Sequence, residues 1–232
     1  MDELLRIENL SKKYGSKTAL DRLDLTVERG HIVGLLGPNG SGKTTLIKLI
    51  AGLLTASEGK ILVNGNAIGV ESKKVISYLP DTTYLNMNQT VDEVIKLFKT
   101  FYADFDENRA KNMLAAIGIE TKTRLKTMSK GTKEKVQLIL VMSRRADLYI
   151  LDEPIAGVDP ATRDYVLNII LSNYDPDASI IISTHLISDI EKILDQVVFI
   201  KNGKIERFGN VDDIREKEGK SIDALFREVF KC

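Results

Sequence analysis

Short apolar runs and alternating positions dominate the first 80 residues and predict β-strands. Residues 32–36 are apolar throughout, which is typical of a strand buried on both faces. Residues 20–27 alternate apolar and polar side chains, which indicates a strand with one buried face. Asn64-Gly65 predicts a tight hairpin turn, and a helix is predicted over residues 44–54. The other predicted strands of this part are residues 4–8, 60–63 and 75–79.

The apolar spacing becomes helical between residues 81 and 146. Thr90 and Glu93 form the sequence pattern of a capping box, so we expect a helix to begin there. Four aromatic residues follow at spacings of three and four, which predicts that they share one helical face in the core of a helical lobe. They are Phe98, Phe101, Tyr102 and Phe105. Two further helices are predicted over residues 108–117 and 133–145.

Strands and helices alternate again after residue 147. Strands are predicted over residues 148–151, 180–183, 197–201 and 204–208, and helices over residues 161–172, 187–194 and 221–230. Such alternation predicts an α/β fold. We therefore expect a core sheet and an antiparallel β subdomain from residues 1–80 and 147–209, an inserted α-helical subdomain from residues 81–146, and a C-terminal helical tail from residues 210–232.

Composition narrows the class of protein. The 232 residues include 33 Lys and Arg and 33 Asp and Glu, and this balance argues against a nucleic-acid binder held by bulk charge. The sole cysteine is Cys232, which excludes a disulfide framework. No apolar run approaches the roughly 20 residues that span a bilayer, and the N-terminus lacks a signal-peptide pattern. These features predict a soluble, cytoplasmic protein.

One glycine-rich segment follows the apolar run 32–36 and precedes a predicted helix. It reads Gly37-Pro38-Asn39-Gly40-Ser41-Gly42-Lys43-Thr44. Its glycines let successive backbone N–H groups face a phosphate chain, and the helix adds the positive end of its dipole. Lys43 supplies a cation for the β- and γ-phosphates, and Thr44 supplies a hydroxyl for Mg²⁺. The segment predicts a site for a nucleoside triphosphate.

Two carboxylates end the predicted strand 148–151, and a histidine follows the strand 180–183. Ligands of parallel sheets bind at the carboxyl ends of strands, so Asp152 is placed to face Mg²⁺ beside the phosphate segment. Glu153 is the better general base for an in-line water. His185 can hydrogen-bond a γ-phosphate or position that water. Structural roles, such as capping for the carboxylates, are the alternative.

In this order, the motifs resemble those of ABC-type ATPases, the nucleotide-binding subunits of ABC transporters. The resemblance extends from Leu4 to about Phe208. It implies a P-loop NTPase core in which the Walker A loop runs from Gly37 to Thr45 and Asp152 and Glu153 end the Walker B strand. It further implies that Tyr14 stacks on adenine, that His185 is the switch histidine, and that residues 156–159, ending in Asp159, form the D-loop.

The segment 128–132, Met-Ser-Lys-Gly-Thr, is similar to the Leu-Ser-Gly-Gly-Gln signature of that family. On its own, Ser129 would be an ordinary helix N-cap. The resemblance implies instead that Ser129 and Gly131 bind the nucleotide held by a second subunit. A dimer with two ATP molecules between its subunits is therefore expected.

Three positions depart from the family pattern. Lys130 replaces the first signature glycine, and Thr132 replaces the glutamine. Asp81 stands where the family has the Q-loop glutamine, and an aspartate oxygen can still reach Mg²⁺ or the nucleotide. Gln89 lies eight residues further on and is not assigned that role.

The resemblance implies an ATP-hydrolysing subunit that uses ATP and Mg²⁺ and powers transport, with export favoured, through a separate transmembrane permease. It would pair with itself or with a related ATPase on the cytoplasmic face of the membrane, without nucleic acid. Two alternatives stay open: a soluble ABC ATPase that acts on nucleic acid or ribosomes, and a regulatory module that barely hydrolyses ATP. A kinase or GTPase is disfavoured, since an Asn-Lys-x-Asp guanine motif is missing.

Overall fold

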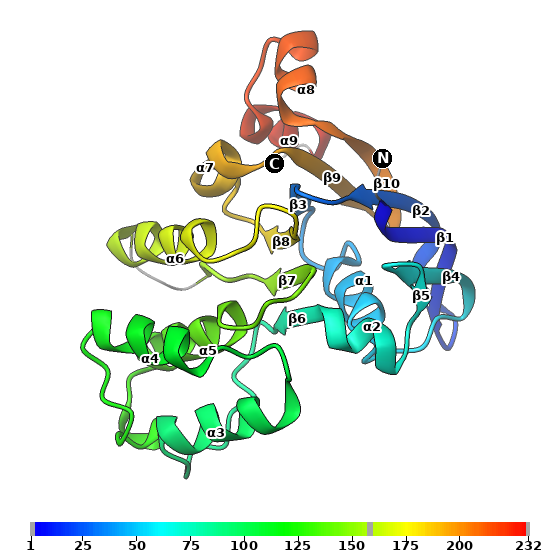
Figure 1. The fold of residues 1–232 in the computed structure, drawn as a ribbon. Helices are drawn as coiled ribbons and strands as arrows, with labels where there is room; N and C mark the ends of the chain where they lie inside the picture. The colour runs from blue at the N-terminus through cyan, green and yellow to red at the C-terminus, as the bar shows by residue number, and fades with distance from the viewer. Residues whose placement is uncertain (1–2, 157–159, 231–232) are drawn as a thin grey trace.

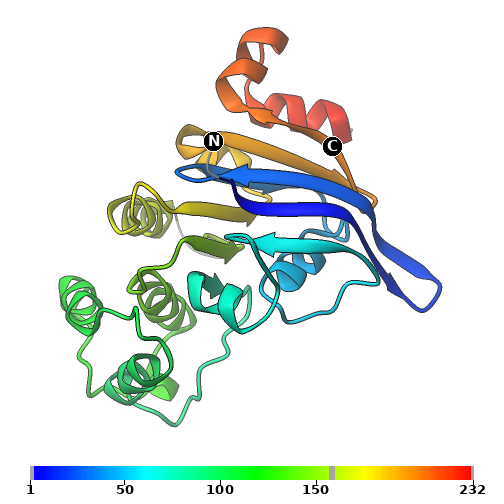
Figure 2. The ribbon, with the colours of Figure 1, turned by 45° about the vertical axis from the view of Figure 1, so that its right-hand side comes forward.

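The computed structural model describes residues 3–156 and 160–230, and its strands form two sheets (Figures 1 and 2). The smaller sheet is antiparallel and has the strand order β2-β1-β4-β5. Its strands are β1 (Glu3–Tyr14), β2 (Lys17–Glu28), β4 (Glu58–Val63) and β5 (Asn66–Ala67). β1 and β2 are longer than predicted and make a hairpin that turns at Gly15.

The larger sheet has the order β10-β9-β3-β8-β7-β6. The strands from β9 to β6 run parallel to their neighbours, whereas β10 is antiparallel to β9. These strands are β3 (Ile32–Leu36), β6 (Ile76–Leu79), β7 (Leu148–Asp152), β8 (Ser179–Thr184), β9 (Gln196–Lys201) and β10 (Lys204–Asn210). The parallel strands carry the carboxyl ends of β3, β7 and β8 to one edge, as the sequence predicts for an α/β fold.

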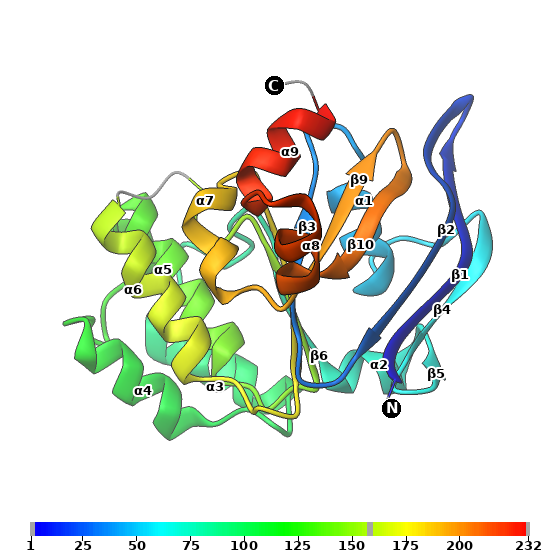
Figure 3. The same ribbon diagram turned by 90° about the horizontal axis from the view of Figure 1, so that it is seen from above.

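The helices occupy distinct places around this sheet (Figure 3). Helix α1 (Lys43–Ile50) packs in the same hydrophobic cluster as the antiparallel sheet. The helical segment between β6 and β7 contains α3 (Val91–Phe101), α4 (Glu107–Ala116), a 3₁₀ turn (Leu125–Thr127) and α5 (Lys130–Met142). The remaining helices are α2 (Val70–Val75), α6 (Pro160–Ser172), α7 (Ile187–Ile190) with a 3₁₀ turn (Glu191–Ile193), α8 (Val211–Glu218) and α9 (Ile222–Phe230).

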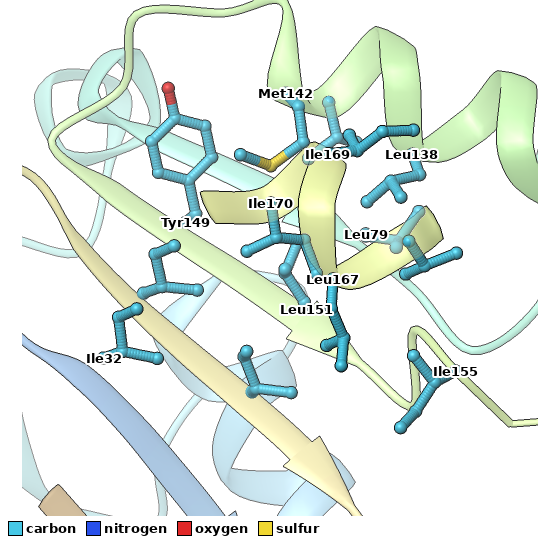
Figure 4. Close-up of a cluster of buried hydrophobic side chains, with 14 of the residues drawn as sticks. Ile32, Leu79, Leu138, Met142, Tyr149, Leu151, Ile155, Leu167, Ile169 and Ile170 are labelled. Atoms are coloured by element: carbon cyan, nitrogen blue, oxygen red, sulfur yellow. The ribbon is translucent and has the colours of Figure 1, made fainter. Parts of the chain in front are cut away.

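The core lies on both faces of the larger sheet because successive side chains of a strand point to opposite faces. Tyr149 and Leu151 of β7 belong to the cluster that includes α5 and α6, as Figure 4 shows. Leu148 and Ile150 of the same strand belong to the cluster formed with α1 and the antiparallel sheet. An apolar run such as residues 148–151 of β7 is therefore needed between two layers.

The predicted capping box at the start of α3 is confirmed. Thr90 Oγ1 accepts a hydrogen bond from the Glu93 backbone N–H at 3.3 Å, and Glu93 Oε2 accepts one from the Thr90 N–H at 2.7 Å. The prediction that four aromatic residues share one helical face is wrong at Phe101, which is 73% exposed. Helix α3 ends at that residue, so Tyr102 and Phe105 reach Phe98 from the following loop, with ring centroids 5.5 Å apart in each pair.

Several helix boundaries differ from the predicted ones: α1 ends at Ile50 instead of residue 54, and α5 ends at Met142 instead of residue 145. Two short helices were not predicted individually. Helix α5 begins three residues before the predicted start, because Ser129 caps it through the Thr132 N–H. The predicted helix over residues 187–194 is divided between α7 and a 3₁₀ turn. Helices α2 and α8 lack a long apolar stripe. Within residues 3–156 and 160–230, no helix is long and apolar enough to cross a membrane.

Candidate functional site

The phosphate loop, residues 37–44, links the carboxyl end of β3 to the start of α1. Its tight path depends on glycine at two positions. A Cβ at Gly37 would lie 2.4 Å from the Ile200 carbonyl oxygen, and Gly42 has a φ of +116° that side chains rarely adopt. The loop therefore approaches the neighbouring backbone more closely than any other residue type would allow.

Two polar side chains of this loop are buried. Lys43 is 6% exposed, and its Nζ donates hydrogen bonds to the carbonyl oxygens of Gly37 at 2.6 Å and Pro38 at 3.3 Å. Burial lowers the pKa of Lys43, although the charges of Glu153 and Asp152 oppose that shift. Ser41 Oγ is buried with no hydrogen-bond partner among the described residues. The loop thus contains the buried ammonium group of Lys43, which backbone carbonyls hold in place, and the Ser41 hydroxyl, which has no partner among the described residues.

A distant hairpin turn fixes the phosphate loop in place. The Gly203 N–H, between β9 and β10, donates to the Ser41 carbonyl at 2.9 Å, and the Gly203 carbonyl accepts from the Asp21 N–H at 2.9 Å. Sequence reasoning identified Asn202-Gly203 only as a turn. Its contact with residues more than 150 positions away is visible only in the fold.

We call the hollow over this loop the phosphate cavity; its volume is about 470 Å³. Tyr14, 47% exposed at the end of β1, lines it, and Lys12 Nζ lies 5.1 Å from the centroid of the Tyr14 ring. The cavity is lined by Tyr14, Lys17, Thr18, Ala19, Asn39, Gly40, Gly42, Lys43, Thr44, Thr45, Asp81, Glu153, Asn202 and Gly203. The structure therefore brings together most of the residues predicted to bind nucleotide.

Asp152 ends β7 and is 1% exposed. Ser183 Oγ, on β8, donates a hydrogen bond to Asp152 Oδ1, whereas Oδ2 is buried without a partner among the described residues. Burial raises the pKa of Asp152, the Ser183 bond opposes that shift, and the nearby carboxylates Asp81 and Glu153 add to it. A carboxylate in this state is a good ligand for a cation, since a cation would satisfy Oδ2 and relieve the repulsion.

Glu153 and His185 form a pair at the same edge of the sheet. Their side chains meet at 2.9 Å, between Glu153 Oε2 and His185 Nδ1. Glu153 has a φ of +52°, which is strained for a residue with a side chain, and its N–H donates to the Ser183 carbonyl at 3.0 Å. The turn directs the Glu153 carboxylate away from the strand and toward the cavities.

A second hollow of about 340 Å³, the adjoining cavity, lies beside this pair. Helix α5 contributes Lys130, Glu134 and Gln137 to its lining. The rest of the lining is Asn39, Leu79, Pro80, Asp81, Thr82, Thr83, Asp152, Glu153, Pro154, Ala156 and His185. Asp81 is exposed and lines both cavities, whereas Gln89 lines neither. Sequence reasoning missed Gln137, because a single polar residue within the apolar run 136–142 gives no motif.

The signature segment, residues 128–132, lies at the start of α5. Ser129 and Gly131 do not line the phosphate cavity of their own chain. Ser129 Oγ instead accepts from the Thr132 N–H at 3.2 Å and lies 2.8 Å from Thr132 Oγ1. The predicted D-loop residue Asp159 lies outside the described residues.

Together, the parallel sheet, the phosphate loop and the carboxylates beside it define a P-loop nucleotide-binding fold. Residues 20–156 match the family model described as ABC transporter. An uncharacterized ABC transporter ATP-binding protein of Methanocaldococcus jannaschii is 34% identical over 94% of this chain and 81% of its own length. The chain belongs to the family of ABC transporter ATP-binding proteins.

Two further similarities agree with this assignment. The SkfA peptide export ATP-binding protein of Bacillus subtilis is 33% identical over 88% of this chain and 87% of its own length. A solved ATP-binding subunit of an ABC transporter superimposes with a TM-score of 0.90 at 32% identity, covering 98% of this chain and 99% of that one. The predicted fold, a P-loop core with an antiparallel β part and an inserted helical part, is confirmed. The subdomain boundaries at residues 81, 147 and 210 stay a prediction.

Proposed function

We propose that this chain hydrolyses ATP and couples the reaction to transport through a separate membrane permease. One observation carries the proposal. The Glu153–His185 pair lies at the edge of the sheet where the phosphate loop, Lys43 and the unpartnered oxygen of Asp152 meet. Phosphoryl transfer to water needs a positive charge, a carboxylate that binds a metal ion, and a base held in position, all at one edge of the sheet.

Nucleotide binding would involve both ends of the phosphate cavity. The half-exposed ring of Tyr14 would stack on adenine at one end. At the other end, the N–H groups of residues 37–45 and the dipole of α1 would surround the phosphates. Lys43 would exchange its bonds to the Gly37 and Pro38 carbonyls for the β- and γ-phosphates, where its charge stabilises the transition state.

The residues around Asp152 fit a magnesium ion. Asp152 Oδ2 is a buried acceptor without a partner among the described residues, and the Thr44 side chain lies close enough to Asp152 to contribute to lowering the pKa of its carboxyl. Thr44, Asp152 and Asp81 would hold Mg²⁺, directly or through water, and the ion would neutralise charge on the phosphates. Hard oxygen donors of this kind suit Mg²⁺ better than a softer metal.

Glu153 would accept a proton from the attacking water, and His185 would orient the carboxylate. The 2.9 Å contact between the two side chains fixes the Glu153 rotamer, and the strained backbone of Glu153 projects it toward the cavities. A general base must lie within hydrogen-bond reach of the proton that it removes. The position of Glu153 in the lining of both cavities supports this role.

We propose a dimer in which Ser129, Gly131 and Asp159 of one subunit complete the site of the other. The N-terminus of α5 offers N–H groups to a phosphate but does not line the phosphate cavity of its own chain. Light scattering of Glu153→Gln with ATP and Mg²⁺ tests this: the mass should double on addition of nucleotide. A monomeric mass despite bound ATP would exclude a nucleotide-driven homodimer and favour a non-identical partner.

Export is the favoured direction, and the membrane contact would pass through a permease at the cytoplasmic face. Support comes from the peptide export ATP-binding protein, which is 33% identical to this chain.

A regulatory module that barely hydrolyses ATP is the second candidate function, because Lys130, Thr132 and Asp81 replace the residues usual in the family. Phosphate release from the purified chain at saturating ATP separates the two: steady turnover supports the ATPase, and binding without turnover supports the module.

A further inference from the structure

Gln137 is a buried polar residue that the motifs do not account for. It is 2% exposed and lies in α5 within a continuous buried run, residues 136–142, whose other members are all apolar. Its Nε2 donates to the Thr82 carbonyl at 3.5 Å, the limit of a hydrogen bond, and its Oε1 is buried without a partner among the described residues. Burying an unpaired amide oxygen is unfavourable, so packing does not explain this residue.

The surroundings of Gln137 indicate what its amide contacts. It lines the adjoining cavity together with Asp152, Glu153 and His185. Every carboxylate there is an acceptor when ionised, and an amide oxygen is also an acceptor. Gln137 Oε1 accepts no hydrogen bond from the donors in that lining, which include Lys130, His185 and the hydroxyls of Thr82 and Thr83. Phosphate oxygens accept as well, so we take the missing donor to be a water molecule. A magnesium ion bound with a nucleotide usually keeps several water ligands. Such waters would be available for this contact.

We propose that Gln137 is a positioning residue for the triphosphate end of the nucleotide. Its amide oxygen accepts a hydrogen bond from a water in the adjoining cavity, and its amide nitrogen holds the loop 80–83, which carries Asp81. Gln137 thereby links α5, which begins at the signature segment, to the side of the site where Glu153 and His185 lie. This inference rests on the proposed function, since it requires that ATP occupies the phosphate cavity.

The experiment compares Gln137→Met with a matched control. Methionine has nearly the volume of glutamine and no amide, so we expect Tm to be unchanged or raised. The control is Gln196→Met: Gln196 Oε1 is also buried without a partner among the described residues, but Gln196 lies on β9 and lines neither cavity. Calorimetry measures the affinity for the non-hydrolysable analogue AMPPNP with Mg²⁺, and for ADP with Mg²⁺.

We expect Gln137→Met to lose at least fivefold in affinity for AMPPNP and less than twofold for ADP, and Gln196→Met to lose neither. AMPPNP affinity that matches the wild type would overturn the inference, as would an equal loss for both nucleotides, because a packing defect does not distinguish them. Failure of the wild-type chain to bind either nucleotide would contradict the proposed function instead.

Gln137→Glu is a second variant of the same shape and keeps the test valid if the methionine variant does not fold. A protonated acid accepts through its carbonyl oxygen and donates through its hydroxyl, as the amide accepts and donates. The charged groups that face it are Asp81, Glu134, Asp152, Glu153, Lys130 and His185. We expect its AMPPNP affinity, relative to the wild type, to improve at least threefold from pH 8 to pH 6. A pH-independent ratio would contradict the role.

Discussion

Two buried carboxylates in different regions of this molecule have opposite environments. Asp152, at the nucleotide edge of the larger sheet, is 1% exposed and has one unpartnered oxygen and a raised pKa. Glu191, in the 3₁₀ turn after α7, is 8% exposed. Burial would raise the pKa of Glu191, but hydrogen bonds from Arg215 and from the Ile222 and Asp223 N–H groups outweigh burial and lower it.

The difference separates a carboxylate that the chain itself satisfies from one that we propose to bind a cation. Glu191 accepts from Arg215 Nη2 at 2.8 Å, from the Ile222 N–H at 3.0 Å and from the Asp223 N–H at 3.2 Å, which ties α8 and α9 to the 3₁₀ turn. Its charge is satisfied by the chain itself. Asp152 retains a buried acceptor that no other described residue satisfies, so its burial is unfavourable unless a ligand such as a cation completes it. Unsatisfied groups beside a cavity thus indicate function more reliably than burial alone.

The largest expected effect belongs to Glu153 and His185, the pair that we propose to be catalytic. We expect Glu153→Gln to reduce ATP turnover at least tenfold, because removing a general base typically costs a factor of about 10²–10⁴. ATP binding should persist, since the amide keeps the shape of the side chain. Phosphate release and nucleotide binding measure the two properties. Near-normal turnover would remove Glu153 from the role of base.

A stability effect should follow at the structural carboxylate. Glu191→Gln loses the charge that Arg215 and two backbone N–H groups contact, so the free energy of unfolding should fall by about 1–2 kcal/mol. For a chain of this size Tm should fall by about 2–8 °C. Thermal unfolding checks this, and ATP affinity should stay within twofold of the wild type. A large loss of ATP affinity without a change in Tm would show that Glu191 acts in nucleotide binding and not in stability, which would contradict the comparison.

A substitution at Asp152 is expected to change Tm in the opposite direction, by raising it. Asp152→Asn removes a buried negative charge that burial and two neighbouring carboxylates disfavour. Tm without nucleotide should therefore rise by about 2–4 °C, a gain common where function requires an unfavourable group. Thermal unfolding with and without Mg²⁺ measures it. A lower Tm for Asp152→Asn in both conditions would show that the carboxylate stabilises the empty fold.

The smallest expected effect is the pH dependence of the two Tm differences, that between Glu191→Gln and the wild type and that between Asp152→Asn and the wild type. Glu191, with a folded pKa below its ordinary 4.5, stabilises the fold above pH 4.5, and the contribution is lost as pH falls through the folded value. Asp152, with a folded pKa above its ordinary 3.8, favours the fold below pH 3.8 and loses that contribution as pH rises through the folded value. The Tm difference between Asp152→Asn and the wild type should therefore narrow as pH falls from 7 toward 3.8, whereas that of Glu191→Gln should narrow only as pH falls below 4.5. Constant gaps would contradict both shifts.

The sequence predicted the local features of the site well. The phosphate loop and the end of the β7 strand are contiguous segments, so their residue types and order suffice to identify them. Prediction also succeeded for the α3 capping box, whose two residues are three positions apart. Such features depend on short-range geometry that any chain with the same residues adopts.

Features that depend on distant contacts were missed. The Gly203 turn reaches Ser41 only because β9 pairs with β3, and Gln137 enters the adjoining cavity only because α5 packs beside the loop 80–83. The four aromatic residues were placed on one helical face because a spacing of three and four assumes that the helix continues to residue 105. The chain leaves the helix at Tyr102, and this ending depends on tertiary packing rather than on periodicity.

The central claim is that Asp152, unlike Glu191, is completed by a magnesium ion bound with ATP. Calorimetry of ATP binding with and without Mg²⁺ tests it most directly, in the Glu153→Gln background so that ATP is not consumed. We expect Mg²⁺ to tighten ATP binding at least tenfold in this background and when Glu191→Gln is added, but less than twofold when Asp152→Asn is added. An undiminished Mg²⁺ effect with Asp152→Asn would contradict it.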